Sequence, residues 1–129
     1  MSENKSEDFQ KKVSHLIVRN QNILDILTKC QSSCGKICRS TVKTATGCGC
    51  IKIVGGKNLS VFSEEKLESK INSGTEGKLC SECKSIIENE IGEMLFYIAG
   101  LCNALGLSMK DIMKREIKNV EVLGKYSLR

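Results

Sequence analysis

The chain has 129 residues, an apolar fraction of 40% and a net charge of +5, values typical of one domain of ordinary size. It contains no run of about 18 apolar residues, and its polar N-terminus lacks the apolar core of a signal peptide. We therefore expect a cytoplasmic protein without a membrane partner. In a reducing compartment, its eight cysteines are expected to be ligands, reactive thiols or core residues rather than disulfides.

The basic residues do not form a concentrated patch, because they are interspersed with acidic ones. Only two tyrosines and three phenylalanines are available for stacking on bases. Nucleic-acid platforms combine a denser basic face with aromatic side chains. We therefore do not expect nucleic acid as a partner, and the positive charge is explained by solubility.

The first predicted element is a helix from about Asp8 to Thr44, preceded by a flexible stretch over residues 1–8. Its apolar side chains recur with the helical spacing of three and four, and the chain contains no proline to interrupt it. If this helix is interrupted, we expect the break at residues 31–36. The helix is weakest there, because Ser32, Ser33 and Gly35 have low helix propensity.

An irregular excursion is predicted over residues 45–78. Within it, Ile51 to Val54 form a short strand or an extended loop. A small helix is expected to begin at Ser63, because Ser63 is a suitable N-cap and Glu64 and Glu65 would lie in the first turn.

Two further helices are predicted, from about Leu79 to Leu105 and from Ser108 to Gly124. Ser108 and Asp111 have capping-box spacing, and Gly106 and Gly124 are natural terminators. The fold class is therefore all-α: a single-domain bundle over residues 1–129 with two long antiparallel helices, a short C-terminal helix and a cysteine-bearing excursion. Because the two long segments share the helical period, we predict a core between them and apolar faces that favour a homodimer. The expected core residues are Leu16, Ile23, Leu27, Ile87, Ile91, Leu95 and Ile98. In the last helix, Ile112, Ile117, Val120 and Leu123 are expected to face inward.

Four cysteines form two tight pairs, Cys48-Gly49-Cys50 and Cys80-Ser81-Glu82-Cys83. Each pair can offer two thiolates to one metal ion, as in tetrahedral zinc sites and iron–sulfur clusters. Antiparallel packing of the long helices would bring the two pairs to one end of the bundle. We predict a zinc site, with an iron–sulfur cluster as the alternative; a disulfide or redox pair and unligated thiols remain the other interpretations.

The other cysteines and the single histidine give weaker signals. Cys30, Cys34 and Cys38 recur every fourth residue, so they are either small core residues or three thiols directed at a cluster. Cys102 is expected in the core. His15 has no partner in the sequence and is expected on the surface.

Two carboxylates form the second candidate site. Glu90 and Glu93 lie three residues apart on the long helix and therefore share a face. They are either part of a solvated face or ligands of a magnesium ion that would hold phosphates. No P-loop supports nucleotide binding, because Gly55-Gly56-Lys57 lacks the rest of that motif.

Residues 90–107, Glu-Ile-Gly-Glu-Met-Leu-Phe-Tyr-Ile-Ala-Gly-Leu-Cys-Asn-Ala-Leu-Gly-Leu, resemble the third helix of MazG-like all-α nucleoside triphosphate pyrophosphohydrolases. The resemblance extends over residues 86–123. It implies a magnesium-binding E-x-x-D motif at Glu90 and Glu93, with Glu93 in place of aspartate. The earlier E-E-x-x-E motif is missing near residues 27–37, although Glu64, Glu65 and Glu68 repeat its pattern later. The resemblance also implies association between copies and nucleotide as a ligand.

Two classes of function follow from these patterns. The first is a divergent MazG-like protein, weakly active or inactive, that serves as a metal-stabilised binding or regulatory module. The second is an active magnesium-dependent pyrophosphohydrolase that uses Glu90 and Glu93 together with Glu64, Glu65 and Glu68.

Overall fold

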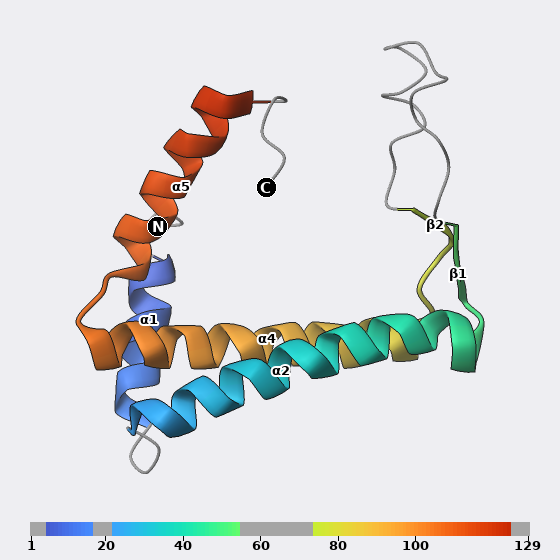
Figure 1. Cartoon of the computed structure of the whole chain (residues 1–129), viewed down its shortest axis with the longest axis horizontal. Helices are drawn as coiled ribbons and strands as arrows, with labels where there is room; N and C mark the ends of the chain where they lie inside the picture. The colour runs from blue at the N-terminus through green and yellow to red at the C-terminus, as the bar shows by residue number, and fades with distance from the viewer. Residues whose placement is uncertain (1–4, 17–21, 55–73, 125–129) are drawn as a thin grey trace. The chain divides into compact units, whose positions relative to one another are not determined.

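The structure, a computed structural model, describes residues 5–16, 22–54 and 74–124. As predicted, it is mostly helical, with two long helices and a short irregular region (Figure 1). Its elements, in chain order, are α1 (Lys5–Leu16), α2 (Ile23–Lys43), the π-helical turn η2 (Thr44–Cys48), β1 (Ile51–Ile53), β2 (Thr75–Gly77), α4 (Ser81–Leu105) and α5 (Met109–Leu123).

The chain divides into two compact units, and both long helices pass from one unit into the other. Unit 1 comprises Met1–Ser33 and Gly92–Arg129, and unit 2 comprises Cys34–Ile91. Among the described residues, no single helix is long and apolar enough to cross a membrane; α4 and α5 meet that criterion only as a pair, across a bend of 110°.

The expected helix from Asp8 to Thr44 is two helices, and the sequence prediction placed the interruption wrongly. Asn22 begins α2: its side-chain oxygen accepts a hydrogen bond from the backbone N–H of Leu24 (2.8 Å), which is the geometry of an N-cap. Residues 31–36, where a break was expected, lie within continuous helix. Lys5–Asp8, expected to be flexible, form the first turn of α1.

The ends of α4 and α5 follow the sequence signals. Gly106 has a positive φ of 70°, and the N–H of Leu107 donates to the carbonyl of Cys102 (2.8 Å), as in a glycine-terminated helix. The Ser108 hydroxyl accepts from the N–H of Asp111 (3.2 Å), which confirms the predicted cap.

The buried apolar side chains of the described chain lie in unit 1. Val13, Ala99, Cys102 and Met109 form one cluster, against which Phe9, Phe96 and Ile98 pack. The side chain of Gln10 links α1 to the start of α5: its oxygen accepts from the N–H of Met109 (2.8 Å), and its nitrogen donates to the carbonyl of Leu107 (2.7 Å).

Much of the predicted core is exposed. Ile87 and Ile98 are half-buried, but the other five expected core residues are exposed, from Ile23 at 36% to Leu16 at 70%. The residues of α5 that were expected to face inward, Ile112, Ile117, Val120 and Leu123, are also exposed. The helical period identifies residues that share a face, but it does not show whether another element covers that face.

Unit 2 contains little core of its own. Within its described residues, 34–54 and 74–91, only Thr44 is buried. The region predicted as an irregular excursion contains η2 and a two-stranded antiparallel hairpin, in which Ile51 pairs with Gly77 and Ile53 with Thr75. The small helix expected from Ser63 lies outside the described residues.

The location of the core can be tested by truncating two side chains of unit 1. Met109 is 8% exposed, whereas Leu95, expected in the core, is 45% exposed. We expect Met109→Ala to lower the free energy of unfolding by about 2–5 kcal/mol, because it removes buried contacts and leaves a cavity. Leu95→Ala should change it by less than about 1 kcal/mol. Chemical denaturation measures both, and an equal loss in the two variants would contradict this core.

Candidate metal centre

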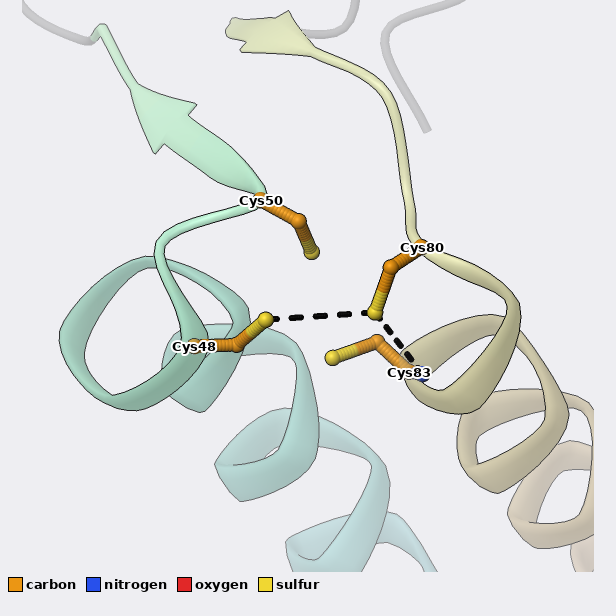
Figure 2. A group of neighbouring side chains, drawn as sticks. All are labelled: Cys48, Cys50, Cys80 and Cys83. Carbon is orange, nitrogen blue, oxygen red and sulfur yellow. Dashed lines mark hydrogen bonds between the residues drawn. The ribbon is translucent and has the colours of Figure 1, made fainter.

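Three elements, η2, β1 and α4, position the predicted cysteine ligands. We call these ligands the four-cysteine site: Cys48, Cys50, Cys80 and Cys83. Cys48 is the last residue of η2, and Cys50 immediately precedes β1. Cys80 immediately precedes α4, and Cys83 lies in the first turn of that helix. Figure 2 shows the four side chains pointing toward one another from the two sides of the site.

The four sulfur atoms lie within 4.8 Å of one another, and those of Cys48 and Cys80 are 3.8 Å apart. A disulfide would need a separation of about 2.05 Å. Zinc–sulfur bonds of about 2.3 Å place neighbouring sulfurs of a tetrahedron about 3.8 Å apart. The four cysteines are therefore spaced to hold one metal ion.

Two glycines allow the chain to bring these cysteines together. Gly49, between the first two ligands, has a φ of 87°, and its N–H donates to the carbonyl of Thr44 (2.8 Å) to close the π-helical turn. Gly77 has a φ of 97°, and a Cβ atom there would lie 2.6 Å from the carbonyl oxygen of Cys50. Only glycine fits at this position, so the hairpin register that carries Cys50 toward Cys80 depends on Gly77.

The start of α4 favours negative charge on the sulfur of Cys80. The backbone N–H of Cys83 donates to the sulfur of Cys80 (3.4 Å), so this thiol takes the place of an N-cap oxygen. The positive end of the helix dipole lies at the same position. A thiolate is therefore stabilised here even before a cation is considered.

Hydrogen bonding within the site separates the pKa values of its thiols. The backbone N–H and the thiol of Cys83 lower the pKa of Cys80 to about 7. The same thiol contact, together with burial and the thiol of Cys50, raises the pKa of Cys83 to about 12. For Cys48, the backbone N–H of Cys50 lowers the pKa, but the thiols of Cys50 and Cys80 raise it and the net direction is upward. A metal ion that binds all four as thiolates must displace protons, so acidification weakens its binding.

The remaining cysteines do not join this site. Cys34 and Cys38 are exposed and Cys30 is half-buried, so the expectation that the three are core residues is wrong for Cys34 and Cys38. Among the described residues, the four-cysteine site is the one group of cysteine, histidine and acidic side chains with metal-binding spacing. Cys102 is buried in the core of unit 1 and His15 is exposed, both as predicted.

The two predicted magnesium ligands have different environments. In unit 2, one carboxylate oxygen of Glu90 is buried and has no hydrogen-bond partner among the described residues. In unit 1, the carboxylate of Glu93 accepts a hydrogen bond from the hydroxyl of Ser33 (3.3 Å). Glu64, Glu65 and Glu68 lie outside the described residues, so their predicted role as ligands stays a prediction.

A cavity beside the four-cysteine site was not foreseen from the sequence. It has a volume of about 230 Å³ and is lined by Ser40, Lys43, Gly47, Cys48, Cys83, Ile86 and Ile87. Part of its lining could have been predicted from the sequence. Ile86 and Ile87 follow Cys83 at the helical spacing of three and four, so the three residues share a face of α4. The contribution of α2 could not be foreseen, because it depends on how the two helices pack.

Comparisons of this chain with protein-family models, with curated proteins and with solved structures return no match. We therefore infer the function of this chain from the geometry and chemistry of the site.

The dependence of the site on Gly77 gives a prediction. We expect Gly77→Ala to weaken metal binding strongly, because the new Cβ would collide with the Cys50 carbonyl and the residue would be held at a positive φ. Gly47→Ala is the matched control: nothing lies within 4 Å of its added Cβ. Competition with a chromogenic chelator measures both affinities. Equal affinity in the two variants would show that the hairpin register does not position Cys50.

Proposed function

We propose that the four-cysteine site binds one zinc ion and that the chain is a metal-stabilised binding or regulatory module. The observation that carries this proposal is the spacing of four sulfur atoms within 4.8 Å of one another. Soft thiolate donors favour zinc, and the cytoplasmic location that we expect for this chain would keep the thiols reduced.

The spacing also supports one ion over a cluster. An iron–sulfur cluster with several irons distributes its four cysteines over different irons, which requires a wider separation of the sulfur atoms than one ion does. Four thiolates also complete a tetrahedral shell and leave no position for water or substrate. This zinc would therefore be structural rather than catalytic.

The scarcity of buried side chains among the described residues of unit 2 supports a structural role for the metal. Its described residues bury only Thr44, whereas the apolar cluster lies in unit 1. A small region without an adequate core is commonly stabilised by a metal, and the free energy of binding then contributes to folding. In this proposal, zinc joins the end of η2 to the start of α4 and fixes the hairpin between them.

Removal of the metal should therefore affect the two units differently. We expect purified protein to be colourless with about one zinc per chain, and Cys80→Ser or a chelator to release that zinc. Amide hydrogen exchange should then increase over residues 44–54 and 74–83, while the segment around Cys102 and Met109 stays protected. A brown preparation rich in iron, or zinc that is retained when both cysteine pairs are replaced, would contradict the proposal.

The exposed face of α5 supports a second copy of the chain as a partner. Met109, at the start of this face, is covered, but Met113, Ile117 and Val120 continue the stripe and are 49–57% exposed. In a two-fold symmetric, antiparallel pairing of α5, the stripes would face each other. The same symmetry would place Lys114 of each copy near Glu121 of the other, so the edges of the stripe are complementary in charge.

Two valines on α5 provide a matched test of this dimer. Val120 lies in the apolar stripe, whereas Val122 projects from the opposite side of the helix and is 83% exposed. We expect Val120→Lys to shift the protein toward the monomer, because it places charge in the interface, and Val122→Lys to leave the dimer intact. Light scattering coupled to size-exclusion chromatography measures the mass. A monomeric parent protein would refute the dimer.

The alternative function is an active magnesium-dependent nucleoside triphosphate pyrophosphohydrolase. The observation in its favour is the buried oxygen of Glu90, because a carboxylate oxygen without a donor can be satisfied by a cation. Against it, Glu90 and Glu93 alone give magnesium few of its approximately six oxygen ligands.

We therefore expect little or no turnover of nucleoside triphosphates. A panel of these compounds, incubated with magnesium or manganese, should yield no monophosphate and pyrophosphate above background. Robust turnover that is lost in both Glu90→Gln and Glu65→Gln would establish the enzyme and displace the non-catalytic module.

A further inference from the structure

The four-cysteine site is not equally protected on all sides. Cys48 is exposed, whereas Cys50, Cys80 and Cys83 are half-buried. Nothing lies within 4 Å of the positions that Cβ atoms would occupy on Gly47 and Gly49, so both neighbours of Cys48 leave open space around it. A small reactant therefore reaches the sulfur of Cys48 more easily than the other three.

The cavity beside the site gives Cys48 a second route of access. Cys48 and Cys83 line it, but Cys50 and Cys80 do not. Its volume of about 230 Å³ suits a small molecule rather than a polypeptide. Lys43 and Ser40 also line it and can donate hydrogen bonds to an oxygen-rich reactant, while Ile86 and Ile87 supply apolar contacts.

A second thiol lies in position to resolve an oxidised Cys48. The sulfur of Cys80 is 3.8 Å from that of Cys48, closer than the 4.8 Å limit that the four share. A disulfide would require this distance to shorten to about 2.05 Å. The glycines on both sides of Cys48 give the backbone the freedom for that movement.

We propose that Cys48 is the site at which a hydroperoxide oxidises this protein, and that a Cys48–Cys80 disulfide then forms and releases the metal. This inference rests on the proposed zinc site and adds its regulation. In the first step, the thiolate sulfur of Cys48 attacks one oxygen of the peroxide. The O–O bond breaks and a sulfenic acid forms. The other oxygen of the peroxide leaves as hydroxide, or as alkoxide from an organic hydroperoxide, and takes a proton to become water or an alcohol.

In the second step, the thiolate of Cys80 attacks the sulfur of the Cys48 sulfenic acid. The S–S bond forms, the S–O bond breaks, and the hydroxide again leaves as water with a proton from solvent. The two sulfurs together lose two electrons, which the peroxide accepts. Zinc then retains only two of its four thiolates and dissociates, so Cys50 at the start of the β1–β2 hairpin loses its anchor.

The test uses the full zinc-loaded chain with Cys34→Ser and Cys38→Ser, which removes the two exposed thiols outside the site. Hydrogen peroxide is added, zinc release is followed with a chromogenic chelator, and the disulfide is mapped by mass spectrometry. We expect zinc release in step with peroxide consumption and a Cys48–Cys80 disulfide as the main product. A reducing agent should restore zinc binding.

The role of the cavity is tested with the metal ligands left intact. Ile86 and Ile91 are both on α4 and both 44% exposed, but only Ile86 lines the cavity. Ile86→Phe should slow zinc release several-fold by narrowing the cavity, Ile86→Ala should accelerate it, and Ile91→Phe should match the parent protein. Opposite changes in the rate of zinc release in the two Ile86 variants would show that access through the cavity, and not a loss of folding, causes the effect.

The possible failures are distinguishable. A protein that binds zinc but retains it in peroxide overturns the oxidation proposal and leaves the zinc site standing. A main product that is Cys48–Cys50 or Cys80–Cys83, or equal release rates in the Ile86 and Ile91 variants, overturns the assigned pairing or route. A freshly purified chain that binds no zinc overturns the proposed function and this inference together.

Discussion

The convergence of four cysteine sulfurs on one point is the constraint on which the described part of unit 2 depends. Two of these sulfurs belong to η2, which follows α2, and to the residue before β1. The other two lie at the start of α4, and the β1–β2 hairpin joins the two sides. With only Thr44 buried in the described residues of this unit, apolar packing contributes little to holding these segments together. Unit 1 differs, because α1, α4 and α5 share an apolar cluster and the hydrogen bonds of Gln10.

This contrast connects structure to the proposed function. A region that is stabilised by a bound ion responds to the ion's availability and to the oxidation state of its ligands, whereas an apolar core responds to neither. The exposed stripe on α5 belongs to the unit with its own core, so in our proposal self-association and metal response are properties of different units. Such a division suits a regulatory or binding module better than an enzyme, which would need an open coordination position or a complete set of carboxylates.

The sequence predicted the features that depend on local spacing. The two cysteine pairs, the cap formed by Ser108 with Asp111 and the glycine terminators are each encoded within a few residues, and the structure contains all of them. From the order of the helices, the sequence also predicted that the two cysteine pairs meet. It did not predict the other features that depend on competition or on distant neighbours. Asn22 starts a new helix because its side-chain oxygen accepts a hydrogen bond from a backbone N–H. The apolar spacing of residues 8–44 continues past this point and did not indicate the start of a helix. The close approach of Gly77 to the Cys50 carbonyl was not predicted, because this contact exists only in the paired hairpin.

In our proposal, one zinc ion is bound by these four sulfurs. X-ray absorption at the zinc edge of freshly purified protein tests it most directly, because it reports the type, number and distance of the ligand atoms. We predict a single shell of four sulfur atoms at about 2.3 Å, with no nitrogen or oxygen ligand and no second metal nearby. A shell containing nitrogen or oxygen atoms, a neighbouring metal, or protein without zinc would contradict it.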